Sequence, residues 1–273
     1  MLKKALPLII IDSHVHIHGC FFIANLLDSA LNNFQKYLKQ NHLQQSPDDN
    51  HTQVLLLTEI TGTDYFAKLV EYAQHQQSID NWSFKLTQET TSICAQNSDG
   101  KSIYLIAGRQ VVTQEKLEVL SLISHSSIRD GLTLEETINQ VIASGGLPVL
   151  PWGFGKWLGN RGELLERLLT NHKFPYLFLG DNGGRPQFWK RSPYFELAHQ
   201  KQIKILPGSD LLALKSETAR AGSFGFTLNA KLDPATPGRL LRELLINPDS
   251  EITPYGKLQN PLKFCQNQLA IRL

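Results

Sequence analysis

The chain has 273 residues, 41% of them hydrophobic and 19% charged, and its 27 basic and 25 acidic side chains leave a formal net charge of +2. This near-neutral balance argues against a dedicated nucleic-acid-binding protein, and a chain of this length can build a core without a disulfide or metal to support it. The three cysteines, Cys20, Cys94 and Cys265, form no CxxC pair, which argues against a zinc ribbon and a disulfide framework.

The first apolar run occupies residues 5–11, contains Pro7 and ends at Asp12. It follows two lysines and superficially resembles a signal peptide, but it is short and lacks a small-residue cleavage site. We therefore predict a buried strand over 8–11. No apolar stretch reaches the roughly 18 residues that cross a bilayer, so we expect a cytoplasmic protein with no membrane partner.

Helical and strand-like patterns alternate in the first part of the chain. In chain order they predict a helix, a loop, a strand and a helix over residues 24–40, 44–52, 54–57 and 64–76. Thr63 is expected to cap the second helix. Short β-like runs over 82–122, with Asp99-Gly100 as a hairpin turn, indicate a local antiparallel excursion.

The regular alternation then resumes and continues to the end of the sequence. Further helices are predicted over 134–144, 163–171, 193–201, 240–245 and 261–271, and further strands over 147–150, 176–179 and 203–206. Short strands joined by helices favour right-handed βαβ units. We therefore predict an α/β fold with a parallel sheet or a TIM-like (β/α) barrel, as one domain over residues 1–273.

The strongest chemical signal is the histidine cluster that directly follows the first predicted strand. His14 and His16 are two residues apart, so on a strand both imidazoles point to the same side, as two ligands of a divalent metal ion must. His18 has the same parity but lies beyond the predicted strand end. The alternative is a hydrogen-bonded or exposed histidine cluster without a metal ion.

Two aspartates follow later predicted strands. Asp210 comes after the strand over 203–206, at the strand end where barrel enzymes place their chemistry, and it could complete a metal site or act as a general base. Alternatively, it caps the following helix. Asp181 ends an earlier strand and could face the same metal ion, or it forms an Asx turn with Gly183. Glu59 ends the second strand, where an ordinary residue leading into a helix is the simpler interpretation.

Two glycine-rich loops, over 151–162 and 180–186, carry cationic and aromatic side chains at the same expected mouth. Glycine allows close approach of the backbone to a ligand, and cations suit phosphate or carboxylate groups. The predicted substrate-binding residues in these loops are Lys156, Arg161, Arg185 and Trp152. The alternative is a pair of flexible turns with solvated cations. Cys20 lies near the histidines, where a small buried thiol is the simpler interpretation.

The order of these motifs resembles the PHP (polymerase and histidinol phosphatase) family of metal-dependent phosphoesterases, which adopt a distorted β/α barrel. Asp12, His14 and His16 match its opening Asp-x-His-x-His, and Asp210 matches its late Gly-Ser-Asp. Five positions at which the family carries metal ligands are occupied here by Ile60, Gln110, Leu120, Trp152 and Leu212. Amidohydrolase barrels also pair a first-strand His-x-His with a late aspartate.

The resemblance and the residues together lead to one expected activity. His14, His16 and Asp210 would bind one divalent ion, such as zinc, manganese or iron, and Asp210 or Asp181 would take a proton. The substrate would be a small anionic molecule, with a phosphoester favoured over an amide, and no nucleic acid is expected as a partner. The alternative is a degenerate barrel that has lost catalysis and binds a small anionic ligand or a protein partner.

Overall fold

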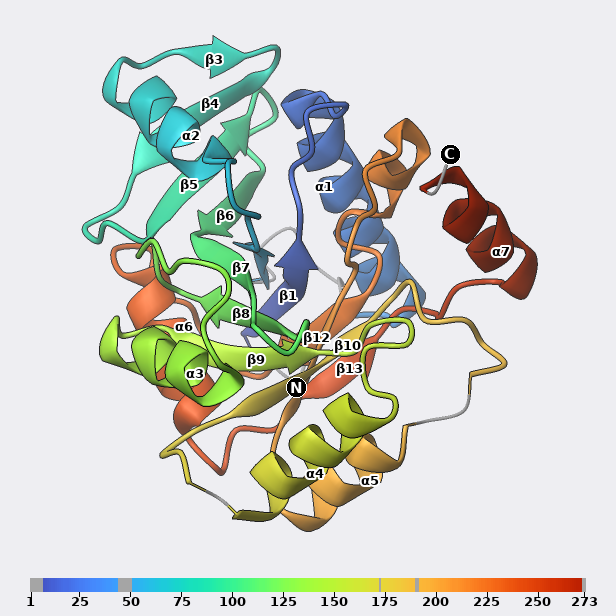
Figure 1. Ribbon diagram of the computed structural model, residues 1–273. Helices are drawn as coiled ribbons and strands as arrows, with labels where there is room; N and C mark the ends of the chain where they lie inside the picture. The colour runs from blue at the N-terminus through green and yellow to red at the C-terminus, as the bar shows by residue number, and fades with distance from the viewer. Residues whose placement is uncertain (1–6, 44–50, 172, 190–191, 272–273) are drawn as a thin grey trace, which may run out of the picture.

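The computed structural model describes residues 7–43, 51–171, 173–189 and 192–271 (Figure 1). The start of the predicted apolar run and the 44–50 part of the predicted loop lie outside the described residues. Helices surround two β-sheets in the described part of the chain. None of these helices combines the length and apolar character that a bilayer crossing requires.

The larger sheet has eight strands. Their order is β13 (Thr253–Tyr255), β12 (Gly225–Leu228), β1 (Leu8–Val15), β2 (His51–Leu57), β6 (Ser102–Ile106), β5 (Ser92–Asn97), β4 (Trp82–Leu86) and β3 (Ser78–Ile79). β1, β2 and β6 are parallel, and the outer strands pair antiparallel. The predicted antiparallel excursion is therefore present as β4, β5 and β6, with a turn between β5 and β6.

The smaller sheet has five strands. Their order is β11 (Ile205–Gly208), β10 (Phe178–Asn182), β9 (Leu147–Pro151), β8 (Glu118–Leu122) and β7 (Gly108–Val112). The first three are parallel, and β7 and β8 are antiparallel. The predicted α/β class is confirmed. Among the described strands, hydrogen bonding gives two sheets, so the closed barrel stays a prediction.

The two sheets meet at two places that matter for the site. Glu59, just after β2, bridges to Arg109 of β7. At the other side, the backbone N–H of Asp210, just after β11, donates to the carbonyl oxygen of His14 in β1 at 2.8 Å. The carboxyl ends of β1 and β11 are thereby held together.

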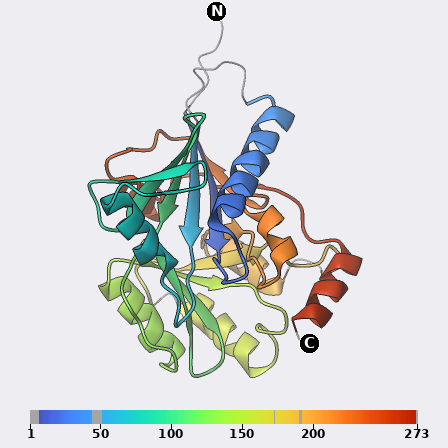
Figure 2. The ribbon, with the colours of Figure 1, turned by 90° about the horizontal axis from the view of Figure 1, so that it is seen from above.

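Seven α-helices and one 3₁₀ helix are described. They are α1 (Ile23–Gln40), α2 (Tyr65–Gln74), α3 (Leu134–Ala143), α4 (Asn160–Asn171), α5 (Pro193–Gln200), η1 (Lys215–Arg220), α6 (Pro237–Ile246) and α7 (Pro261–Ala270). The apolar face that predicted α1 is buried, and α1 lies beside η1 (Figures 1 and 2). Asn33 joins the two by donating to the carbonyl oxygens of Ala219 and Ala221.

β1 is buried on both faces, which explains its continuous apolar sequence. Ile10 packs into the core beside α1, whereas Ile9 and Ile11 pack into the core shared with β11 and α6. Polar residues enter β1 only near its carboxyl end. The strand therefore positions the histidines on a rigid support.

Two local predictions are wrong, and two strands were not predicted. Asp64 and not Thr63 caps α2, because the Asp64 carboxylate accepts from the Ala67 backbone N–H at 3.1 Å. His51 and Thr52 belong to β2 and not to a loop, because they pair with the start of β1. β12 and β13 were not predicted, because they are stabilised by pairing with strands that are distant in sequence and not by a local pattern.

Candidate metal centre

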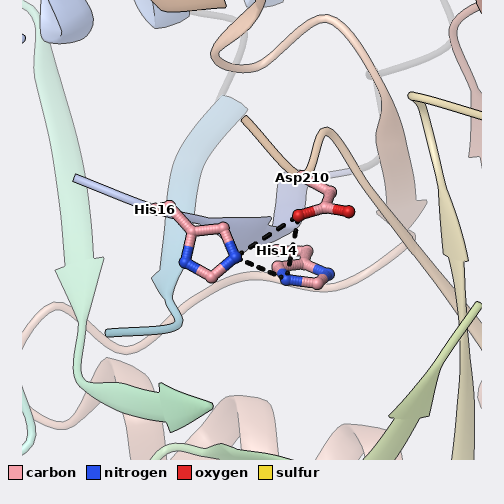
Figure 3. Close-up of side chains that lie close together, drawn as sticks. All are labelled: His14, His16 and Asp210. Carbon is pink, nitrogen blue, oxygen red and sulfur yellow. Dashed lines mark hydrogen bonds and ion pairs between the residues drawn. The ribbon is translucent and has the colours of Figure 1, made fainter. Parts of the chain in front are cut away.

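His14 lies near the carboxyl end of β1 and His16 directly follows the strand, and their side chains converge as the parity argument predicts (Figure 3). The two Nε2 atoms lie 3.0 Å apart. The pairing of β1 with β2 is irregular between Asp12 and Val15, a distortion of the kind that redirects side chains at strand ends. Both histidines are buried.

Asp210 completes the group from the other sheet. Its Oδ1 lies 3.4 Å from His14 Nε2 and 3.3 Å from His16 Nε2 (Figure 3). The backbone of Asp210 has φ +49°, a left-handed conformation that costs energy in a residue other than glycine. Strain of this kind persists only where surrounding contacts hold it, and it marks Asp210 as a positioned residue.

The three side chains fit a divalent metal ion. Ligand atoms about 2.0–2.2 Å from a common ion lie roughly 3 Å apart in octahedral geometry and slightly further in tetrahedral geometry. The observed separations of 3.0, 3.3 and 3.4 Å match this spacing. Two imidazoles and one carboxylate are a donor set that suits zinc, manganese or iron.

The ionisation states also suit a metal ion. Burial lowers the pKa of His14 to about 4, so its ring is neutral at pH 7 and keeps a lone pair for a ligand bond. Burial opposes ionisation of Asp210, but the nearby His14 and His16 hold the pKa of its carboxyl well below the usual range. The donors are therefore a neutral imidazole and a carboxylate.

Asp12 connects the segments that carry these ligands, a role that sequence analysis did not assign. Its carboxylate accepts from the backbone N–H groups of Ser209 at 2.8 Å, Gly222 at 2.9 Å and His14 at 3.3 Å. Burial raises the pKa of Asp12 to about 6, although these hydrogen bonds oppose that shift. The position of Asp12 two residues before His14 was the sequence feature that could have indicated this supporting role.

Asn182, at the end of β10, is a second residue that sequence analysis missed. Its Nδ2 donates to Asp210 Oδ2 and, at 3.2 Å, to the carbonyl oxygen of Trp152. The amide therefore orients the aspartate carboxylate from the side opposite the histidines. Its position at a strand end, next to Asp181, was the signal that could have identified it.

His16 and Asp210 line a pocket of about 420 Å³. Of the predicted substrate-binding residues, Lys156 and Trp152 line this pocket. Lys156 Nζ forms an ion pair with Glu118 Oε1 at 3.0 Å, and Trp152 is almost fully buried. His18 also lines the pocket, with its Nε2 2.8 Å from the carbonyl oxygen of Leu211.

The structure does not bring Asp181, Arg185 or Arg161 into the lining of this pocket. Asp181 accepts from Arg185 Nε and Nη2, both at 2.8 Å, and the guanidinium is buried. Arg161 donates to the carbonyl oxygen of Gly155 at 2.9 Å. Asp181 and Arg185 thus form an ion pair with each other. Neither side chain contacts the candidate metal ligands in the described structure.

The remaining candidate site residues make structural contacts or line the pocket. Glu59 Oε1 accepts from the backbone N–H groups of Tyr65 and Phe66 at the start of α2, which agrees with the simpler interpretation of this residue. Cys20 packs against the core beside α1. Of the five positions that depart from the PHP pattern, Leu120 is buried in the core, and Ile60, Gln110, Trp152 and Leu212 line the pocket.

Comparisons with known proteins find similarity in fold. No known protein family and no curated protein matches the sequence. PsfC from Pseudomonas syringae PB-5123 superposes with a TM-score of 0.57 and 14% identity over 98% of this chain and 99% of that one. The novel lesion-specific endonuclease PfuEndoQ from Pyrococcus furiosus superposes with a TM-score of 0.52 and 14% identity. That match covers 90% of this chain and 57% of the endonuclease. These comparisons do not show membership of the PHP family.

Proposed function

We propose that this protein is a metal-dependent hydrolase that cleaves a phosphoester of a small anionic substrate. The observation that carries the proposal is the convergence of His14, His16 and Asp210, with ligand atoms 3.0–3.4 Å apart, next to a pocket that His16 and Asp210 line. One protein of similar fold is by name an endonuclease, a class of enzyme that cleaves phosphodiester bonds. The likeness in fold supports the proposal without identifying the substrate.

The distorted barrel of the PHP type belongs to the same proposal. It is supported by the approach of β1 to β11 and by the bridge between Glu59 and Arg109. His14, His16 and Asp210 would hold one divalent ion, which when bound supplies Lewis acidity and lowers the pKa of a bound water molecule. Such an ion would lie at the carboxyl ends of the strands, where barrel enzymes carry out their chemistry.

Hydrolysis consumes one water molecule and involves no redox change. The water oxygen forms a new bond to phosphorus, the bond from phosphorus to the ester oxygen breaks, and one water proton ends on the departing oxygen. Asp210 lines the pocket beside His16 and would transfer the proton from water to the departing oxygen without retaining it, while Lys156 would bind phosphate oxygens. Asp181 has no part in this proposal, because Arg185 neutralises it.

The experiment is to purify the protein without a histidine tag, measure its metal content, and screen it against phosphomonoesters and phosphodiesters. We expect about one ion per chain and metal-dependent turnover, both lost in His14→Ala and His16→Ala. His75→Ala is the matched control, since His75 is exposed at the end of α2 and lies outside the pocket lining. Substoichiometric metal that His16→Ala leaves unchanged would overturn the proposal.

The second candidate function is ligand binding without catalysis. Gln110, Trp152 and Leu212 line the pocket at positions where the PHP family carries further ligands, so the described donor group has three members. A protein that binds metal and phosphate but turns over no ester or amide in a broad screen would favour this candidate.

A further inference from the structure

Large apolar side chains face solvent around the mouth of the candidate pocket. They are Ile60, which follows β2, Phe154, which follows β9, and Ile271, which follows α7, with 38%, 44% and 45% of each exposed. They come from three separate segments of the chain and line the same pocket. Exposed apolar groups gathered around a pocket are typical of a binding site for an apolar ligand group.

The mouth continues into an aromatic wall. The Phe154 ring centroid lies 5.3 Å from that of Phe264 on α7 and 5.5 Å from that of Trp189. The Trp189 ring in turn lies 6.0 Å from Trp152, which borders the inner part of the pocket next to Asn182. Trp152, Phe154 and Phe264 of this aromatic group belong to the lining of the candidate pocket.

α7 is held in place as part of this wall. It lies at the periphery of the fold in both views (Figures 1 and 2), yet Asn267 on its inner face is buried. The Asn267 Nδ2 donates to Glu217 Oε1 at 2.8 Å, and Glu217 is fully buried. This buried hydrogen bond connects α7 to η1 and so stabilises the position of the wall.

The lining of the same pocket also carries polar side chains. They are His16, Asp210, Gln110 and the ion-paired Lys156. A pocket of about 420 Å³ holds a small organic molecule and not merely an inorganic anion. The pocket lining thus offers polar contacts for a charged group and apolar contacts for an organic group of the same ligand.

We propose that the preferred substrate is a phosphomonoester of an apolar alcohol, with its phosphate beside His16 and Asp210 and its hydrocarbon or aromatic group against Phe154 and Phe264. This inference rests on the proposed function for the reaction, and on the apolar wall for the identity of the organic group. The products are inorganic phosphate and the apolar alcohol, by the same balanced hydrolysis.

The test compares benzyl phosphate with glycerol phosphate, two alkyl esters that differ mainly in the polarity of the organic group, using metal-loaded protein. We expect kcat/KM to favour benzyl phosphate by about tenfold or more. Phe154→Ala should abolish most of this preference and Phe154→Leu should retain it. Leu269→Ala is the control, because Leu269 is an exposed apolar residue of α7 outside the pocket lining.

A binding measurement separates this inference from the proposed reaction. Benzylphosphonate should bind more tightly than hydroxyethylphosphonate by calorimetry, and Phe154→Ala should reduce the difference. If this preference appears without any turnover, the ligand class stands and the hydrolase proposal fails. Equal turnover or equal binding of the apolar and the polar compound would overturn the inference. A preference for the apolar compound that Phe154→Ala does not change would also overturn it. If Phe154→Ala instead disrupts association with a copurifying protein and leaves small-molecule preference intact, the wall is a protein-binding surface and the inference is also overturned.

Discussion

Arg220 donates from Nη2 to the carbonyl oxygen of Ser209 at 3.0 Å, and so holds the residue that immediately precedes Asp210. Through Nη1 the same guanidinium pairs with the fully buried Glu217. The left-handed backbone of Asp210 is thereby restrained from η1 as well as from β1. A candidate metal ligand in a strained conformation depends on such supporting contacts.

Arg220→Met should therefore lower both stability and metal affinity. The change leaves the Glu217 carboxylate buried without its ion-pair partner, which we expect to lower the free energy of unfolding by about 3 kcal/mol. Loss of the contact to Ser209 should weaken metal binding by about tenfold. Urea unfolding and metal titration measure the two effects.

The double variant Glu217→Gln/Arg220→Met provides the control. Glutamine removes the buried charge and keeps an oxygen that can accept from Asn267, so the double variant should recover much of the lost stability. Metal affinity should stay low, because the hydrogen bond to Ser209 is still absent. Recovery of both quantities together would contradict a positioning role for Arg220.

Gly208, the last residue of β11, should not tolerate alanine. A Cβ there would lie 2.4 Å from both the backbone nitrogen and the Cβ of His14, so β1 and β11 could not keep their present separation. We expect Gly208→Ala to lower the free energy of unfolding by about 2–3 kcal/mol and to weaken metal binding. Thermal unfolding and metal titration test this. Gly19→Ala, at an exposed site with only an ordinary contact, should change stability by less than about 0.5 kcal/mol.

Asp64 should stabilise α2 in a pH-dependent manner. Burial opposes its ionisation, but hydrogen bonds from His125 and the Ala67 backbone and the charge of Arg109 hold the pKa of Asp64 below its usual value. A carboxyl with a lower pKa in the folded state contributes stability above its unfolded pKa and loses it as pH falls through the folded value. Asp64→Ala should thus cost about 1 kcal/mol at pH 7 and progressively less below about pH 4.

Thr63→Ala is the matched control for the cap. The Thr63 hydroxyl donates to the carbonyl oxygen of Ile60 and does not accept from the helix. Thr63→Ala should therefore lower the free energy of unfolding at pH 7 by less than Asp64→Ala, and its effect should not depend on pH in this way. Urea unfolding of both variants between pH 3 and 7 makes the comparison. A larger loss for Thr63→Ala than for Asp64→Ala would restore the sequence-based assignment of the cap.

Lys156 and Glu118 should have opposite effects on anion binding. Both line the pocket and pair at 3.0 Å, so the positive charge of Lys156 is partly offset where a phosphate would enter. Lys156→Ala should weaken phosphate binding several-fold, and Glu118→Gln should strengthen it. Titration calorimetry at low and high salt measures both, since screening should reduce the differences. Lys173→Ala removes a similar ion pair with Glu135 outside this pocket and should leave phosphate binding unchanged.

The sequence by itself determined the α/β class, the buried first strand and the convergence of His14 and His16. These depend on local regularities, because apolar runs mark buried strands and residues two apart on a strand share one side. The late Asp210 was also identifiable, since the residue after a strand in a βα series lies at a predictable edge of the sheet.

Only the tertiary structure decided which other side chains support the group of His14, His16 and Asp210. Asp12 and Arg220 were not predicted to act on Asp210, because their contacts join segments that are distant in sequence. Asp181 and Arg185 looked available in the sequence but neutralise each other in the fold. Hydrogen bonds and ion pairs form between whichever groups the packed backbone brings within reach, and that distance is a property of the whole chain and not of any local pattern.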